Sequence, residues 1–252
     1  MNTNKVAVIS GATSEMAREL LQAYIAEGVD VISITRNKSK LLEYFPDQAN
    51  HIEPHVVETD IVDYEQTRDK VDAAITRLGG RVDYLINAVG SFSAGTITEL
   101  KPADFIGSFN INLLAIFNTT KIVVPYMIDR SKGAIVNVAS ILGYQSLPDT
   151  PCSHYAAVKA GVIQFSKMLA VELGIHNIRV NCVCPGILSP DASGAGADYL
   201  EKIKALNRFL AHQPIKHFGS QAQIAAAIKF LTAEDSAWTT GAVLCVDGGM
   251  TA

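Results

Sequence analysis

The N-terminal segment constrains the fold most, because it reads as a strand, a tight turn and a helix. Residues 5–10 form a short apolar run of the β type, residues 11–17 hold the turn, and residues 18–28 carry apolar side chains at helical spacing. Gly11 lets the chain turn and approach a ligand closely. Such a unit aims backbone N–H groups and a helix N-terminus at a diphosphate. It predicts a dinucleotide-binding fold.

The rest of the chain repeats the alternation of β-like and helical runs, with no linker, internal repeat or low-complexity tract. Parallel strands joined by crossover helices satisfy this order. With 252 residues and 48% hydrophobic content, the chain can bury one large core. We expect a single α/β domain over residues 1–252, a doubly wound parallel sheet (Rossmann fold) of about seven strands with helices on both faces.

Tyr155 and Lys159 are four residues apart and would share one helix face. A free tyrosine has a pKa of about 10, and a nearby cation favours the phenolate, which makes proton exchange with an alcohol or carbonyl easier. The same spacing also arises by chance on amphipathic surface helices. The pair therefore indicates carbonyl or alcohol redox chemistry only in combination with other motifs.

The second apolar stretch, residues 29–34, is followed by Thr35 and Arg36. In dinucleotide-binding folds an acid at this strand tip binds the ribose 2′-hydroxyl, whereas an arginine accommodates a 2′-phosphate. Arg36 therefore favours NADP(H) over NAD(H). The alternative is an ordinary solvated loop cation.

These motifs together resemble the single-domain branch of the short-chain dehydrogenase/reductase family, and most of all its 3-oxoacyl-carrier-protein reductases. The resemblance runs from Lys5 to the C-terminus and rests on eight short motifs in the family's order and spacing. The matching pieces are residues 11–14, Asp60 and Ile61, residues 87–90, Asn112, Ser140 within residues 137–143, Tyr155 with Lys159, residues 185–187 and residues 240–249.

The resemblance implies that Tyr155 is the general acid that protonates a carbonyl oxygen, or the base for the reverse oxidation. It implies that Lys159 lowers the pKa of Tyr155 and holds the nicotinamide ribose, that Ser140 binds the substrate oxygen, and that Asn112 anchors a proton-relay water. Hydride arriving at a carbonyl carbon builds charge on the oxygen, which such donors stabilise. Ser140 and Asn112 could instead be structural polar residues.

By the same resemblance, the cofactor would contact the first turn, the ends of several strands and the catalytic pair. The expected cofactor residues are Gly11, Thr13, Ser14, Glu15, Met16, Arg36, Asp60, Ile61, Asn87, Ala88, Val89, Gly90, Tyr155, Lys159, Pro185, Gly186 and Ile187. The expected substrate-pocket residues are Phe92, Ser93, Ile141, Tyr144, Gln145, Leu147 and Leu188, and the apolar ones favour a substrate with a hydrophobic body. Residues 192–197, before an expected helix at 198–210, suit a lid or an ordinary surface loop.

Two positions depart from the family pattern. Glu15 stands where the family has a second turn glycine, and its carboxylate would oppose a diphosphate unless it is turned away or paired, for instance with Arg36. Alternatively Glu15 begins the helix, where an acid is favourable by about 0.3 to 1 kcal/mol. Ala88 replaces a second asparagine and leaves Asn87 to make any cross-strand hydrogen bonds.

Several classes of function and location receive no support. A net charge of −4 without a basic cluster does not favour nucleic-acid binding. The N-terminus lacks the features of a secretory signal, and polar residues with Pro125 interrupt the apolar stretch 111–128, so we expect a buried helix and a cytoplasmic protein without a membrane span. The four cysteines lack paired spacing, so we expect no metal site or disulfide, with Cys182 and Cys184 on opposite faces of one strand.

The leading hypothesis is an NADPH-dependent ketoreductase acting on a 3-oxoacyl thioester or a related ketone. An acidic carrier protein would need a basic rim, for which Arg130, Lys132 and Lys121 are candidates. The alternative, motivated by Glu15, is a non-redox or cofactor-impaired member such as an isomerase, dehydratase or binding protein. The apolar helices at 111–128 and 155–173 favour a homotetramer with two-fold axes.

Overall fold

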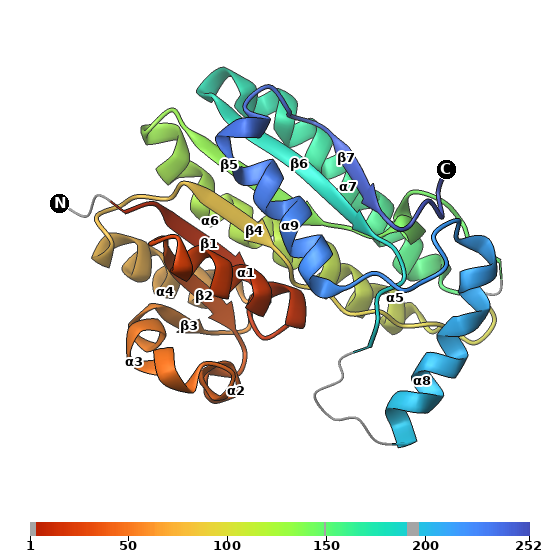
Figure 1. Cartoon of the computed structure of the whole chain (residues 1–252). Coiled ribbons are helices and arrows are strands. Elements are labelled where there is room, and N and C mark those ends of the chain that lie inside the picture. The colour runs from red at the N-terminus through yellow and green to blue at the C-terminus, as the bar shows by residue number, and fades with distance from the viewer. Residues whose placement is uncertain (1–3, 149, 191–196) are drawn as a thin grey trace.

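The computed structural model describes residues 4–148, 150–190 and 197–252. Seven parallel strands form one sheet in the order β3-β2-β1-β4-β5-β6-β7 (Figure 1). The strands are β1 (Val6–Ser10), β2 (Asp30–Thr35), β3 (Val56–Glu58), β4 (Tyr84–Asn87), β5 (Gly133–Val138), β6 (Ile178–Pro185) and β7 (Val243–Val246). The helices are α1 (Glu15–Ala26), α2 (Lys38–Glu43), α3 (Ala49–Ile52), α4 (Tyr64–Arg77), α5 (Pro102–Phe109), α6 (Ala115–Asp129), α7 (Ser153–Leu173), α8 (Ala197–Asn207) and α9 (Gln221–Thr232).

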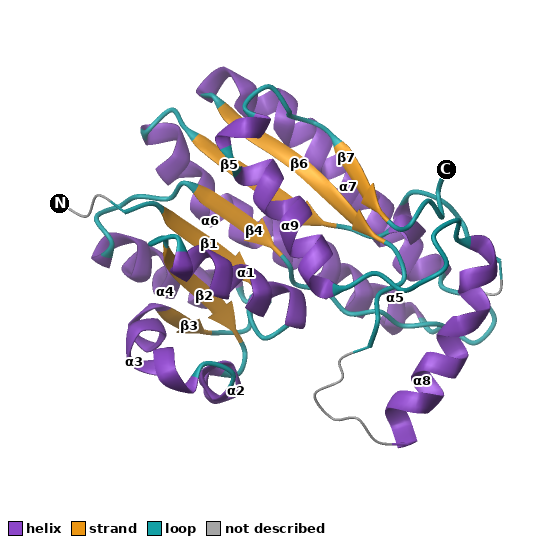
Figure 2. Ribbon diagram, in the orientation of Figure 1, coloured by secondary structure: helices purple, strands orange, loops and turns teal. Residues whose placement is uncertain are grey.

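Helices cover both faces of the sheet, as the sequence predicts. α1 and α9 pack together on one face, and α4, α6 and α7 cover the other (Figure 2). Along β1, Ala7 and Ile9 belong to the core on the α1 and α9 side, whereas Val6 and Val8 belong to the core on the opposite side. The sheet is therefore buried on both faces, which explains why its strands read as continuous apolar runs.

The direction of winding reverses between β1 and β4, because the chain runs from β1 outward to β3 and then returns to the other side of β1. Ligands bind at such a switch point in open α/β sheets. Gly11 follows β1 with φ 73°, and a Cβ at this position would lie 2.8 Å from the carbonyl oxygen of Ala88, which follows β4. Only glycine allows these two loops to meet.

A buried polar network ties the strands together just below this crevice. Asn87 is fully buried, and its side chain donates to Asn137 Oδ1 of β5 (2.8 Å) and accepts from the Ser10 hydroxyl of β1 (3.2 Å). Asn137 in turn donates to the Ser166 hydroxyl of α7 (2.9 Å). The expectation that Asn87 makes the cross-strand bonds is confirmed, and the network fixes α7 against the sheet.

The helical stretch Pro102–Asp129 is long and apolar enough to cross a membrane by length and composition alone, but half of its most apolar window is buried in the fold. Core helices of proteins without a membrane span meet the same criterion. Ile116, Val123 and Met127 are fully buried among the residues that pack on the sheet. These contacts agree with the buried helix expected at 111–128.

Cys182 and Cys184 lie on the same face of β6, so the expectation of opposite faces is wrong. Both side chains are fully buried in one cluster. Residues two apart along a strand share a face, which is the rule that the expectation misapplied. All four cysteines are free thiols, and the described residues contain no group of three or more side chains arranged to hold a metal ion.

Candidate active site

Tyr155, Ser140 and Lys159 meet at the carboxyl end of β5. Ser140 follows this strand after one residue, and α7 begins at Ser153, so Tyr155 lies in its first turn and Lys159 one turn further on. Tyr155 and Ser140 are 9% and 8% exposed, and the Ser140 hydroxyl is near enough to Tyr155 to lower the pKa of its phenol. The structure thus brings together the phenol and the hydroxyl that the sequence predicts as catalytic.

The Lys159 ammonium is buried behind this pair and donates to the carbonyl oxygen of Val138 (3.0 Å). A Cβ at Gly90 would lie 3.2 Å from Lys159 Nζ and 2.8 Å from Asn112 Oδ1. Lys159 and Asn112 therefore both approach the loop after β4 at Gly90. The absence of a side chain at this position leaves room for them.

The pKa values of this pair shift in opposite directions. Burial lowers the pKa of Lys159 to about 8, and burial raises the pKa of Tyr155 to about 12, although the hydrogen bond from Ser140 acts against the latter shift. Lys159 Nζ lies 5.8 Å from the Tyr155 ring centroid. In this structure the pKa of Tyr155 is therefore above that of a free tyrosine, with burial as the largest cause. The lowering by Lys159 that the family resemblance implies stays a prediction.

Asn112 lies in a π-helical turn, η3 (Asn110–Leu114), between α5 and α6. Its amide donates to the carbonyl oxygens of Ser91 and Ser108 (both 3.0 Å), and its Oδ1 accepts from the Ser91 backbone N–H (3.1 Å). Short π-helical turns of this kind occur often at functional sites. Here the turn aims Asn112 at the loop after β4 and fixes that loop beside Lys159.

A groove of about 420 Å³ runs over the switch point between β1 and β4. Eight of the predicted cofactor residues line it: Gly11, Thr13, Ser14, Arg36, Ile61, Ala88, Val89 and Gly90. Of the others, Met16 belongs to the first turn of α1 and is buried, and Asn87 belongs to the buried network. Asp60 accepts a hydrogen bond from the Val62 backbone N–H. Pro185, Gly186 and Ile187 lie at the end of β6, on the same edge of the sheet as Tyr155 and Lys159.

Glu15 is the first residue of α1, which begins three residues before the start that the apolar spacing indicates. Ser14 caps this helix by accepting a hydrogen bond from the Ala17 backbone N–H (3.3 Å). The Glu15 carboxylate thus lies in the first helical turn, where the partial positive charge of the helix end favours an acid. This placement matches the interpretation of Glu15 as a helix-start residue.

Lys40 lines the groove together with Arg36 and was missed by the sequence interpretation. Asn37 caps α2 by accepting from the Lys40 backbone N–H (2.8 Å), so Lys40 lies in the first turn of that helix, on the groove side. The capping signal at Asn37 could have located this second cation.

The loop after β4 is also fastened to the start of α7. Ser93 Oγ and His154 Nε2 are 2.7 Å apart, and the Gly95 backbone N–H donates to the Pro151 carbonyl oxygen (2.8 Å). His154 is 3% exposed. These bonds hold Phe92 edge-on against the Tyr155 ring, with centroids 5.1 Å apart. No sequence signal singles out His154 as the residue that fixes this loop.

A second cavity, of about 390 Å³, adjoins the start of α7. Leu147 is the one predicted substrate residue that lines it, with Ile97, Leu142, Pro151 and Cys152 among its neighbours there. Of the other predicted residues, Phe92 and Ser93 lie in the loop over Tyr155, and Ile141 is buried in the core. Tyr144 and Gln145 are exposed, and Leu188 forms a β-bridge with Gly219.

The predicted lid falls partly outside the described residues, which omit 191–196. The helix expected at 198–210 is present as α8. The expected basic rim is wrong for Arg130 and Lys132, because both line a cavity at the amino ends of the strands, opposite Tyr155. Lys121 lies over the ring of Tyr64, the first residue of α4.

Comparisons with known proteins agree with this geometry. A family model described as enoyl-(acyl carrier protein) reductase matches residues 11–251. The chain is 34% identical to the 3-oxoacyl-[acyl-carrier-protein] reductase of Thermotoga maritima over 251 residues, which cover 98% of this chain and 97% of the relative. It is 31% identical to the 2,3-dihydro-2,3-dihydroxybenzoate dehydrogenase of Bacillus subtilis over 256 residues, with coverages of 98% and 96%.

Solved structures show the same likeness. The structure of ElxO with NADP bound matches with a TM-score of 0.85 and 27% identity, covering 99% of both chains. A 3-oxoacyl-[acyl-carrier protein] reductase from Brucella melitensis with bound NAD matches with a TM-score of 0.81 and 28% identity, covering 98% of this chain and 92% of that one. From its motifs, its fold and these relatives, we conclude that the chain belongs to the short-chain dehydrogenase/reductase family of nicotinamide-dependent oxidoreductases.

Proposed function

We propose that this protein is an NADPH-dependent ketoreductase that reduces a 3-oxoacyl thioester or a related ketone, with residues 1–252 acting as one cytoplasmic domain. The observation that carries the proposal is the buried pair of Tyr155 and Ser140 next to the buried Lys159, beside the groove at the switch point. Relatives named as 3-oxoacyl-[acyl-carrier-protein] reductases support the substrate class.

The residues of this edge divide the work of a carbonyl reduction. The nicotinamide, when bound, supplies hydride to the carbonyl carbon. Ser140 donates a hydrogen bond to the carbonyl oxygen, and Tyr155 transfers its phenolic proton to that oxygen, which leaves an alcohol and a phenolate. The charge of Lys159 stabilises the phenolate until solvent returns a proton. Asn112 is hydrogen-bonded to the loop after β4 and so helps to keep these groups in position.

The pKa values explain why both Tyr155 and Lys159 are needed. With its pKa raised to about 12, the phenol is fully protonated at neutral pH and is available as an acid, but on its own it is a weak one. Lys159, with a pKa of about 8, still carries most of its charge at pH 7. Transfer of the Tyr155 proton therefore creates an ion pair in a site where charges are poorly screened.

Arg36 and Lys40 support the preference for NADPH. Both are exposed cations that line the groove near the end of β2, where the adenosine ribose lies in dinucleotide-binding folds. A 2′-phosphate would meet two positive charges there, whereas a 2′-hydroxyl would gain little. The solved relatives include structures with NAD and with NADP, so the preference rests on these two residues.

The cavity beside the start of α7 supports a partly apolar substrate. Ile97, Leu142, Leu147 and Cys152 supply apolar walls, and the pKa of the Cys152 thiol is raised by burial, which keeps this side chain neutral. Thr96, Ser146, Thr150 and Ser153 add hydroxyls to the lining. An acyl chain or ring with a few polar groups suits such a wall.

We further propose a homotetramer, because three helices present apolar side chains to solvent. Phe105, Ile106, Phe109 and Phe117 lie 40% to 58% exposed on α5 and α6, and Met168 and Val171 lie 49% and 73% exposed on α7. Other apolar residues of the helix expected at 111–128, such as Ile116, Val123 and Met127, are fully buried in this chain. Exposed apolar side chains on helices that pack together favour burial against a second copy.

The first test is turnover. We expect the protein to oxidise NADPH in the presence of a short 3-oxoacyl thioester, and Tyr155→Phe to lower kcat by about 10²- to 10⁴-fold with the NADPH affinity unchanged, because only the proton donor is lost. Tyr126→Phe, which alters a tyrosine of α6 that donates to Asp72 and lines neither the groove nor the second cavity, is the matched control and should keep full activity. Equal activity of both variants would refute the role of Tyr155, and failure to bind millimolar NADPH would favour the non-redox alternative.

Cofactor preference is tested by charge removal. Arg36→Gln and Lys40→Gln should each lower the ratio of kcat/KM for NADPH to that for NADH by about tenfold, because each loses one close charge–phosphate attraction. Lys38→Gln is the control, since Lys38 pairs with Glu53 and does not line the groove. A ratio unchanged in the first two variants would show that their side chains face solvent in the complex.

The bond between Ser93 and His154 should position Phe92 over Tyr155. We expect His154→Leu and Ser93→Ala each to lower kcat/KM for the ketone by about tenfold, because small displacements of reacting groups are costly. The double variant should be no worse than the single ones, because both changes remove one bond. Additive losses, or an equal rise in the Kd for NADPH, would contradict a role confined to this loop.

Assembly is tested by light scattering at micromolar concentration. We expect a tetramer, and we expect Phe109→Glu to shift it toward smaller species by placing a charge in an apolar contact. Ile215→Glu, at another exposed apolar position outside these helices, should leave the size unchanged. A fully active 27.0 kDa monomer would overturn the assembly.

A further inference from the structure

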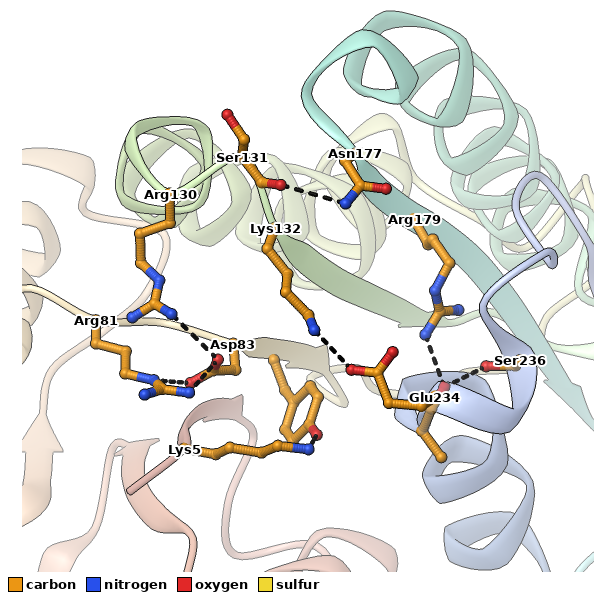
Figure 3. Close-up of polar contacts among 12 residues, drawn as sticks. Lys5, Arg81, Asp83, Arg130, Ser131, Lys132, Asn177, Arg179, Glu234 and Ser236 are labelled. Carbon is orange, nitrogen blue, oxygen red and sulfur yellow. Dashed lines mark hydrogen bonds and ion pairs between the residues drawn. The ribbon is translucent and has the colours of Figure 1, made fainter. Parts of the chain in front are cut away.

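A third cavity, of about 290 Å³, lies at the opposite edge of the sheet from Tyr155. It opens at the amino ends of β1, β4, β5 and β6, so the length of β5, about 20 Å, separates it from the catalytic residues. We call it the basic cavity, and Figure 3 shows most of its charged side chains converging on it. Its charged lining residues are Lys5, Arg81, Arg130, Lys132, Arg179, Asp83 and Glu234.

The two carboxylates of the basic cavity are already paired. Asp83 accepts from Arg81 through both oxygens (2.6 and 2.8 Å), lies 3.9 Å from Arg130 and also accepts the Val6 backbone N–H (2.8 Å). Glu234 accepts from Lys132 (2.8 Å), and Lys132, Lys5 and Arg179 together lower its pKa. Five cationic side chains thus face two carboxylates, which leaves an excess of three positive charges in a chain whose net charge is −4.

Helix ends offset only part of this excess. α6 ends immediately before Arg130, and Arg179 donates to the carbonyl oxygens of Leu231 (2.7 Å) and Ala233 (3.1 Å) at the end of α9. Each helix C-terminus carries a partial charge of about −0.5. About two positive charges therefore remain, which matches the charge of a phosphate monoester at neutral pH.

The backbone beside the basic cavity is strained. Among the described residues, Ser131 and Asn177 alone combine a positive φ, of 50° and 56°, with a side chain. Asn177 donates to the Ser131 carbonyl oxygen (3.3 Å), and Figure 3 shows the two residues side by side at the rim. Ser131 turns the chain between Arg130 and Lys132, both of which line the cavity. Strain of this kind persists where surrounding structure enforces it, often at binding sites.

We propose that the basic cavity binds the phosphate group of a small phosphorylated molecule. Arg130 and Lys132 are its accessible donors, with side chains 35% and 58% exposed, and Lys5 adds an ammonium whose recorded partner among the described residues is the Tyr84 phenol (2.6 Å) rather than a carboxylate. The volume exceeds that of phosphate alone and accommodates a short organic body. This site is independent of the proposed reductase activity.

Calorimetric titration at constant ionic strength tests the proposal, with inorganic phosphate and glycerol phosphate as probes. Both should bind the wild type, and glycerol phosphate should bind more tightly because it fills more of the cavity. The double variant Arg130→Gln/Lys132→Gln should weaken both by about tenfold or more, because two charges near a dianion are lost. The matched control is Arg68→Gln/Lys70→Gln, which removes the same two kinds of side chain from α4, outside both the basic cavity and the cofactor groove, and should leave this binding intact.

A second variant keeps the test decisive if the double variant folds poorly. Glu234→Gln removes the competing carboxylate at an exposed position and should tighten phosphate binding several-fold. The proposal fails if neither probe binds, if inorganic phosphate binds but glycerol phosphate does not, if the control variant loses as much affinity as Arg130→Gln/Lys132→Gln, or if Glu234→Gln leaves the affinity unchanged.

Discussion

The burial of the Lys159 ammonium is the constraint on which the catalytic edge depends. A buried cation without a carboxylate partner is costly and needs hydrogen bonds to compensate. Here the carbonyl oxygen of Val138 supplies one, and the absence of a side chain at Gly90 keeps space for the ammonium and for Asn112. One buried charge is therefore surrounded by the end of β5, the loop after β4 and the π-helical turn before α6. A side chain at Gly90 would press against both the ammonium and Asn112.

The same burial gives the site two groups whose pKa values move apart. Burial raises the pKa of Tyr155 and lowers that of Lys159. At neutral pH the site therefore holds a protonated phenol beside an ammonium that is mostly charged but within about one pH unit of its pKa. Pairs of titratable groups separated in this way are typical of acid–base sites. In the proposed reaction, this arrangement keeps the acid protonated until its proton is transferred and places a counter-charge beside the phenolate that results.

The sequence predicts the fold and the position of Tyr155 and Lys159, because the signals for both are local in the chain. The order of strands and helices follows from alternating periodicity, and the Tyr155–Lys159 spacing places both groups on one helix. It does not predict the direction of the Tyr155 shift, since a motif shows which charges are near but not how much solvent is lost. His154 and Lys40 also escape prediction, because their roles depend on contacts between segments far apart in the chain. Arg130 and Lys132 mislead for the same reason, since parallel topology carries them to the far edge of the sheet.

The pH dependence of ketone reduction tests the role of Lys159 most directly. At saturating NADPH, kcat/KM for the ketone should be constant below about pH 8 and fall by about tenfold per pH unit above it, because neutral Lys159 no longer stabilises the phenolate. Lys159→Arg keeps its charge throughout this range, so its plateau, although lower, should extend without that decline. The same decline near pH 8 in both proteins would contradict the account, because it would show that a group other than Lys159 controls the proton transfer.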